Sequence, residues 1–72
     1  MIKVYTRENC PQCKVLKMKL KQNNVDYTEI QDDNKIGDIA TKSGIRTLPI
    51  SEINGEIKSF KDMIEYLKAG GK

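Results

Sequence analysis

Histidine is absent from this 72-residue chain, and phenylalanine, proline and long apolar runs are scarce. Without histidine the chain cannot form a Ser-His-Asp triad, a Cys-His dyad or a His-ligated metal site. No run approaches the roughly 18 apolar residues that a membrane span needs. Residues 1–5 also lack the long apolar run of a secretory signal, so we expect a cytoplasmic protein that binds no membrane.

Charge and size narrow the possibilities further. The 13 basic and 10 acidic residues give a formal net charge of +3, which is too small to predict nucleic-acid binding. Hydrophobic residues make up 38% of the chain and charged residues 32%, proportions that suit a folded globule. Because this length leaves room for only one small core, residues 1–72 are predicted to form a single domain.

Local patterns in the first half predict two strands around a helix. Ile2–Thr6 alternates and is rich in β-forming residues, so we predict a strand there. A helix is predicted to open at Cys10–Pro11, because proline fits the first helical turn, and to end at Asn23–Asn24. Val25–Ile30 is the second predicted strand.

Local patterns in the second half of the chain predict another helix, a β-hairpin and a final helix. Asp32–Asn34 offers an N-cap for a helix that ends at Gly44. Leu48–Ile53 is the third predicted strand, and Asn54–Gly55 is a strong signal for a hairpin turn into a fourth. A final amphipathic helix is predicted because apolar residues recur there at helical spacing, at Phe60, Met63, Ile64 and Leu67. We expect Gly70–Gly71 to end this helix.

The resulting order is β-α-β-α-β-β-α, which predicts the α/β class. A strand, a helix and a following strand form a right-handed parallel crossover, and the hairpin adds an antiparallel pair. We therefore predict a four-stranded mixed sheet flanked by three helices.

The first predicted helix has one clearly apolar side. Cys13, Leu16 and Leu20 fall on this side at helical spacing, which predicts a core face. Val15 and Met18 lie away from it, so we expect this helix to contact more than one neighbour. A separate basic stripe is interpreted as a solvated face, with docking of an acidic partner as the alternative. The stripe consists of Lys14, Lys17 and Lys21.

The two cysteines stand at a C-x-x-C spacing, Cys10-Pro11-Gln12-Cys13. Such a pair can be a structural disulfide, half of a metal site or a redox centre. A structural disulfide gains most by closing a long loop, and this loop is very short. A mononuclear zinc site needs four ligands, so two chains would have to share it. A redox centre needs a strand that leads into the head of a helix, which the sequence provides, and we favour this interpretation.

Position along the helix distinguishes the two cysteines. Cys10, at the predicted N-cap, lies near unpaired backbone N–H groups and the positive end of the helix dipole, and both favour a thiolate. Because Cys10 is also the more exposed position, it is the predicted nucleophile. Cys13, one turn further, would attack a mixed disulfide formed on Cys10.

With these motifs placed, nearly the whole chain resembles a glutaredoxin-type member of the thioredoxin superfamily. In that family the proline equivalent to Pro49 is cis and lies beside the disulfide. The residue before it, here Leu48, would bind the main chain of a substrate as an added strand does. The resemblance is carried by the Val4–Thr6 strand, Cys10–Cys13, Thr47-Leu48-Pro49, the Asn54–Gly55 turn and the final helix.

The resemblance also implies a set of binding residues for substrate or glutathione. Arg7 stands where a basic residue of the family contacts a carboxylate of glutathione. Lys61 and Asp62 open the last helix, whose N–H groups could hold a carboxylate while Asp62 meets an amine. The full implied set is Arg7, Pro11, Gln12, Thr47, Leu48, Pro49, Lys61 and Asp62.

Two branches of the family share these motifs. Glutathione-linked glutaredoxins are similar at Pro11 and Thr47–Pro49, but Lys58–Ser59 occupies the place of their glycine pair. NrdH-redoxins donate electrons to ribonucleotide reductase and are recharged by thioredoxin reductase. They usually carry a glutamine where Gln12 stands, and Ser59–Lys61 matches part of their Ser-Gly-Phe segment.

The resemblance therefore implies a monomeric thiol-disulfide oxidoreductase that needs no bound metal or cofactor. We expect it to reduce protein disulfides or glutathione mixed disulfides through Cys10 and Cys13, with glutathione as co-substrate. An NrdH-like donor to ribonucleotide reductase, recharged by thioredoxin reductase, is the alternative within the family. An alternative of another class is a non-enzymatic module in which a homodimer shares zinc or an iron-sulfur cluster.

Overall fold

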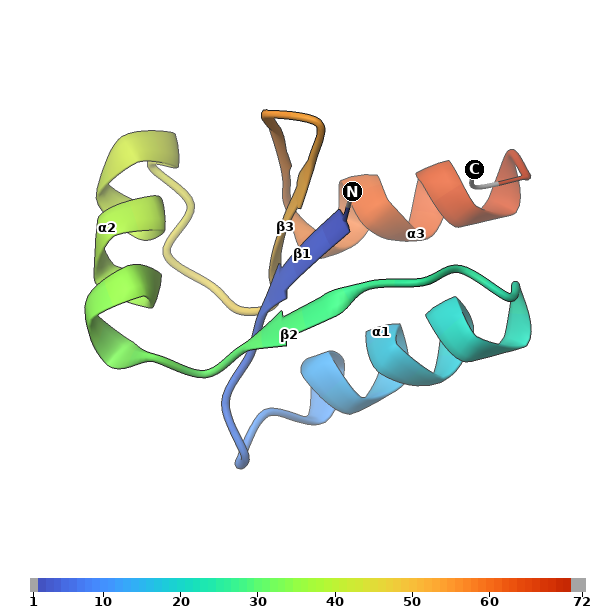
Figure 1. Ribbon diagram of the computed structural model, residues 1–72, viewed down its shortest axis with the longest axis horizontal. Coiled ribbons are helices and arrows are strands. Elements are labelled where there is room, and N and C mark those ends of the chain that lie inside the picture. Colours follow the sequence, from blue (N-terminus) through green and yellow to red (C-terminus); the bar gives the residue numbers. More distant parts are fainter. Residues whose placement is uncertain (1, 71–72) are drawn as a thin grey trace.

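A computed structural model describes residues 2–70 and shows a four-stranded sheet with helices on both faces (Figure 1). The predicted order of elements is confirmed: β1 (Ile2–Tyr5), α1 (Pro11–Gln22), β2 (Thr28–Ile30), α2 (Asp33–Ser43), β3 (Ile50–Ile53), β4 (Glu56–Lys58) and α3 (Phe60–Lys68). The strand order in the sheet is β2-β1-β3-β4. β1 pairs with β2 in parallel and with β3 antiparallel, and β3 and β4 form the hairpin.

Alternation along β1 divides the interior into two cores, because successive side chains of a strand point to opposite faces. On one face Ile2 and Val4 pack under α1 and α3, and on the other Tyr5 packs under α2. The first core is completed by Leu16, Leu20, Met63 and Leu67. The second is completed by Ile36, Ile39 and Ile50.

The helix ends follow the capping residues of the sequence. Asp32 caps α2 by accepting hydrogen bonds from the backbone N–H groups of Asn34 and Lys35, and Gly44 ends that helix at a φ of 75°. Such a left-handed conformation suits glycine because it has no Cβ. At the other end of the chain, Ala69 is the C-cap of α3 and Gly70 has a φ of 102°, while Gly71 lies outside the described residues.

Three predicted strands are shorter in the structure than in the sequence pattern. β1 ends at Tyr5 rather than Thr6. The backbone N–H of Val25 donates to the carbonyl of Leu20 at 2.9 Å, so this residue completes the end of α1 rather than pairing in the sheet. β2 therefore begins only at Thr28. β3 begins at Ile50 rather than Leu48, because Pro49 has no N–H to donate to a neighbouring strand.

The exposed side of α1 corrects part of one expectation from the sequence. Cys13, Leu16 and Leu20 are fully buried as predicted, but Val15 is 42% exposed and Met18 is 59% exposed. The expectation that α1 contacts more than one neighbour is confirmed, since it packs on both the sheet and α3, but Val15 and Met18 have no part in this, because both contacts are made by the buried side of the helix. No helix within residues 2–70 is long and apolar enough to cross a membrane.

Candidate active site

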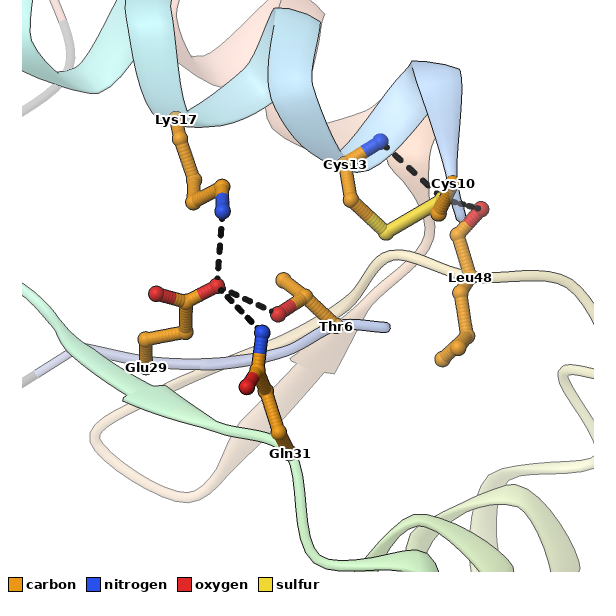
Figure 2. The surroundings of a disulfide bond; sticks show 7 residues. All are labelled: Thr6, Cys10, Cys13, Lys17, Glu29, Gln31 and Leu48. Carbon is orange, nitrogen blue, oxygen red and sulfur yellow. Dashed lines mark hydrogen bonds and ion pairs between the residues drawn. A yellow bond between two sulfur atoms is a disulfide. The ribbon is translucent and has the colours of Figure 1, made fainter. Parts of the chain in front are cut away.

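A disulfide joins Cys10 and Cys13 at the head of α1 (Figure 2). Cys10 is the N-cap residue, with an extended backbone, and its Sγ accepts a hydrogen bond of 3.1 Å from the backbone N–H of Cys13. Cys13 is completely buried, whereas Cys10 is half-buried. The sulfur of Cys10 is therefore the one that another molecule can reach.

Local sequence explains why the pair lies at this point. The backbone N–H of Thr6 donates to the carbonyl of Ile30 at 2.9 Å, which fixes the chain as it leaves β1. A short loop then leads to Pro11 at the first helical position, where the missing proline N–H is not needed. The strand, the loop and the start of the helix thus place Cys10 at the end of the sheet where β1 stops.

The loop before β3 forms the other side of the site. The peptide bond between Leu48 and Pro49 is cis, as the resemblance implied, and Pro49 is fully buried. The carbonyl oxygen of Leu48 lies 3.7 Å from Cys10 Sγ. In the dithiol form, this carbonyl can accept a hydrogen bond from the Cys10 thiol, whereas the Cys13 N–H favours the thiolate.

Two neighbouring hollows lie on this side of the site, and Cys10 lines the first of them. The first has a volume of about 620 Å³, and the second, between α2 and the Leu48 loop, has about 250 Å³. Arg7 and Leu48 line both of them, so the two hollows adjoin, and we refer to them together as the groove. The first hollow is lined by Arg7, Glu8, Asn9, Cys10, Gln31, Asp33 and Leu48.

Charges of both signs occupy this groove. The Arg7 guanidinium forms an ion pair of 3.4 Å with Asp33, and both side chains are largely exposed, so the pair contributes little stability. Glu8 adds a second carboxylate to the same hollow, while Arg46 lines the neighbouring one. The groove therefore presents two guanidinium groups and two carboxylates rather than a purely basic surface.

The remaining residues of the predicted binding set lie around the same edge of the sheet. Pro11, Gln12 and Thr47 are exposed. The pairing of Ser51 with Lys58 returns the chain to the end of the sheet where β1 stops, so α3 begins at the same edge as Cys10. The first turn of α3 carries Lys61 and Asp62, both exposed, and neither is among the described residues that line the groove.

A polar cluster that the sequence did not predict adjoins the disulfide (Figure 2). Oε2 of Glu29 accepts hydrogen bonds from the Thr6 hydroxyl at 2.6 Å, Lys17 Nζ at 2.8 Å and Gln31 Nε2 at 3.3 Å. The bonds from Lys17 and Thr6 hold the pKa of Glu29 below its ordinary value. We call these four residues the Glu29 cluster. It connects α1 to β2 and to the residue after β1 at the end of the sheet that carries Cys10, which we call the active-site edge.

Metal-binding side chains do not gather elsewhere in the part of the chain that the structure covers. Residues 2–70 contain no group of three or more histidine, cysteine, aspartate or glutamate side chains that could hold a metal ion. A site shared between two chains, as the homodimer alternative requires, stays a prediction.

The fold and the disulfide at the helix head define a thiol-disulfide oxidoreductase with a thioredoxin-like fold. The family model that matches this chain, over residues 2–58, is that of glutaredoxin. The chain belongs to the glutaredoxin family.

Known relatives agree with this assignment. An uncharacterized glutaredoxin-like 8.6 kDa protein in the rubredoxin operon of Clostridium pasteurianum is 35% identical over 63 residues, which cover 79% of this chain and 80% of that protein. The crystal structure of the thioredoxin-like protein BC3987 shows 32% identity, a TM-score of 0.78 and coverage of 97% and 99% of the two chains. The NrdH-redoxin of Escherichia coli shows 27% identity, a TM-score of 0.70 and coverage of 81% and 79%.

Proposed function

We propose that this protein is a dithiol electron donor that reduces disulfides of other proteins through Cys10 and Cys13. The observation that carries the proposal is the arrangement of the pair, with an accessible Cys10 sulfur at the head of α1 and a buried Cys13 bonded to it. A buried second cysteine is well placed to resolve an intermediate without itself meeting the client.

The reaction proceeds in two exchanges between sulfur atoms. The Cys10 thiolate attacks one sulfur of the client disulfide, the Cys10–client bond forms, and the second client sulfur leaves as a thiolate. The Cys13 thiolate then attacks Cys10 Sγ, forms the Cys10–Cys13 disulfide and releases the first client sulfur as a thiolate. The client gains two electrons, the protein loses two, and the client thiolates take protons from water.

Backbone groups of the Leu48 loop and the α1 head orient the client. The Leu48 carbonyl lies beside Cys10 Sγ, so a client main chain that lies along this loop brings its own sulfur against Cys10. Pro49 is buried beneath and holds the loop in place, while Pro11, Gln12 and Thr47 are exposed around it. Because these backbone groups bind the main chain of a client, which all proteins share, they suit a donor with several protein substrates.

The charges in the groove favour a protein reductase over glutathione as the source of electrons. Glutathione carries two carboxylates and one amine at neutral pH. Beside Cys10 it meets Glu8 and Asp33, and Arg7 is already paired with Asp33. The similarity to an NrdH-redoxin, a glutaredoxin-like protein with a thioredoxin-like activity profile, supports the same choice. We therefore propose recharging by thioredoxin reductase.

Glutathione is the second candidate, and two observations favour it. Arg7 lies in the groove beside Cys10, where it can exchange Asp33 for a carboxylate of glutathione. The first turn of α3, with Lys61 and Asp62, opens at the same edge of the sheet. In this alternative, Arg7→Gln lowers the rate of reduction by glutathione several-fold, and Arg46→Gln provides the matched control in the neighbouring hollow.

One experiment separates the two sources of electrons. The oxidised protein is mixed with NADPH and thioredoxin reductase, or with NADPH, glutathione and glutathione reductase, and NADPH consumption is followed. The proposal predicts rapid stoichiometric reduction of the protein disulfide by thioredoxin reductase and at least tenfold slower reduction by glutathione. Rapid reduction by glutathione alone overturns this choice of reductant, and protein that neither system reduces overturns the dithiol function itself. Cys10→Ser protein gives the background rate.

A further inference from the structure

The exposed side of α1 combines apolar and basic residues. Met18 is 59% exposed and Val15 is 42% exposed, and these two are the large exposed apolar side chains among residues 2–70. At helical spacing, Lys14, Val15 and Lys21 are all neighbours of Met18, and Pro11 is the neighbour of Val15. We call Pro11, Lys14, Val15, Met18 and Lys21 the α1 outer face.

The net positive charge of the protein is concentrated on this helix. α1 contains four of the 13 basic residues and no acidic residue, so nine basic and ten acidic residues remain elsewhere in the chain. Among the described residues, neither Lys14 nor Lys21 forms an ion pair. Asp26 lines the same shallow hollow as Lys21 without pairing with it. The lysines of α1 are Lys14, Lys17, Lys19 and Lys21.

The α1 outer face is continuous with the redox site. Pro11 directly follows Cys10, and the helix rises by about 1.5 Å per residue, so Met18 lies about 12 Å along the axis from Cys10. An extended chain covers about 3.3 Å per residue. When a cysteine of a partner segment is bonded to Cys10, the fourth residue after that cysteine therefore reaches Met18. In Figure 1, α1 lies at the lower right of the view, below β2.

We infer that the α1 outer face selects redox partner proteins whose disulfide is followed, about four residues along, by an apolar side chain flanked by acidic residues. The apolar side chain packs on Met18 and Val15, where the flexible thioether adapts to its shape. The acidic residues meet Lys14 and Lys21, which steers the encounter and fixes its direction along the helix. This inference rests on the proposed function and names the class of partner for it.

The test uses synthetic peptides with one cysteine linked to neutral thiopyridine. Attack of Cys10 on the peptide sulfur releases thiopyridone, which is followed by absorbance under stopped flow, and Cys13 then releases the peptide thiol. The first peptide carries leucine between two aspartates at the fourth residue after its cysteine. A second peptide replaces the aspartates by lysines, and a third replaces the leucine by serine. Dithiodipyridine, a small neutral disulfide, measures the intrinsic reactivity of Cys10 with each variant.

Two variants and one matched control address the surface directly. Lys21→Glu reverses a charge about 16 Å along the helix axis from Cys10, which is remote enough to leave the sulfur itself undisturbed. Met18→Ser removes the exposed apolar side chain, which has little to do with folding because it is mostly in solvent. Lys42→Glu makes the same charge change on the exposed surface of α2. Each peptide rate constant is divided by the rate constant for dithiodipyridine.

At low ionic strength the wild-type protein is expected to reduce the acidic peptide on the order of tenfold faster than the basic one. Salt at 0.5 M or the Lys21→Glu change removes most of this preference, and Lys42→Glu leaves it in place. Met18→Ser removes the preference for leucine over serine. Equal rates for the acidic and basic peptides overturn the inference, as does an equal effect of Lys42→Glu. If dithiodipyridine itself is not reduced, the proposed function fails instead.

Discussion

The Glu29 cluster yields a quantitative prediction about what holds the active-site edge together. Thr6 is completely buried, and its hydroxyl donates to Glu29 at 2.6 Å. Thr6→Val keeps the shape of the side chain and removes this donor. A hydrogen bond to a charged group contributes about 1.5–3 kcal/mol. Because the Glu29 side chain is 31% exposed, water replaces part of the lost bond, and we expect a loss of about 1–1.5 kcal/mol.

The same bond makes this loss depend on pH. The pKa of Glu29 in the folded protein is lowered from its ordinary value of 4.5, so the stabilisation is present above that value. It is lost as the pH falls through the lower folded pKa, where the carboxylate takes up a proton. Thr6→Val moves the folded pKa of Glu29 back toward 4.5. The difference in stability between wild type and variant is therefore expected to shrink in acid.

Urea unfolding of the oxidised protein at pH 7 and at pH 2.5 measures both effects. Thr28→Val is the matched control, because Thr28 is an exposed threonine of β2. A double-mutant cycle with Glu29→Gln is expected to give a coupling of about 0.5–1 kcal/mol at pH 7. The reasoning is refuted if Thr6→Val costs no more than Thr28→Val, or if its cost is the same at both pH values.

Two further predictions concern the cores. Met63→Ala is expected to lower the free energy of unfolding by about 2–5 kcal/mol, because this side chain of α3 is completely buried in the first core. Met18→Ala is expected to change the free energy of unfolding by less than about 0.5 kcal/mol, because Met18 is exposed. Urea unfolding measures both values, and equal costs would contradict the packing. Burial and the nearby Glu52 carboxylate raise the pKa of Tyr5 above 10.0. Folding stability should therefore fall as the pH rises above 10, because the unfolded chain releases this proton first. An absorbance titration should show a late phenol ionisation that Tyr5→Phe removes, and a titration unchanged by Tyr5→Phe would exclude the shift.

The order of elements could be predicted because each one has a local signal. Asn54 and Gly55 both have positive φ in the structure, at 51° and 88°, as the hairpin turn requires. The N-cap position of Cys10 followed from a strand, a short polar loop and a proline. These features depend on residues close together in the sequence, where propensity and geometry determine the outcome.

The groove and the Glu29 cluster could not be predicted in the same way, because they depend on contacts between distant residues. Thr6 meets Glu29 only because β1 and β2 pair in parallel with Tyr5 opposite Ile30. Asp33 was recognised as part of a helix cap, but its pairing with Arg7 needs the start of α2 beside the loop after β1. The exposure of Met18 likewise depends on what packs against α1, which its helical pattern does not specify.

The most direct test of the central claim, that Cys10 attacks and Cys13 resolves, is the mass of a trapped intermediate. Reduced Cys13→Ser protein is mixed with one of the thiopyridyl peptides and analysed by intact-protein and fragment mass spectrometry, with Cys10→Ser protein treated in parallel. We predict that Cys13→Ser gains one peptide, located on Cys10, and that Cys10→Ser gains far less because Cys13 is buried. No adduct on Cys10, or equal labelling of Cys13 in the Cys10→Ser protein, would contradict the assignment of the two roles.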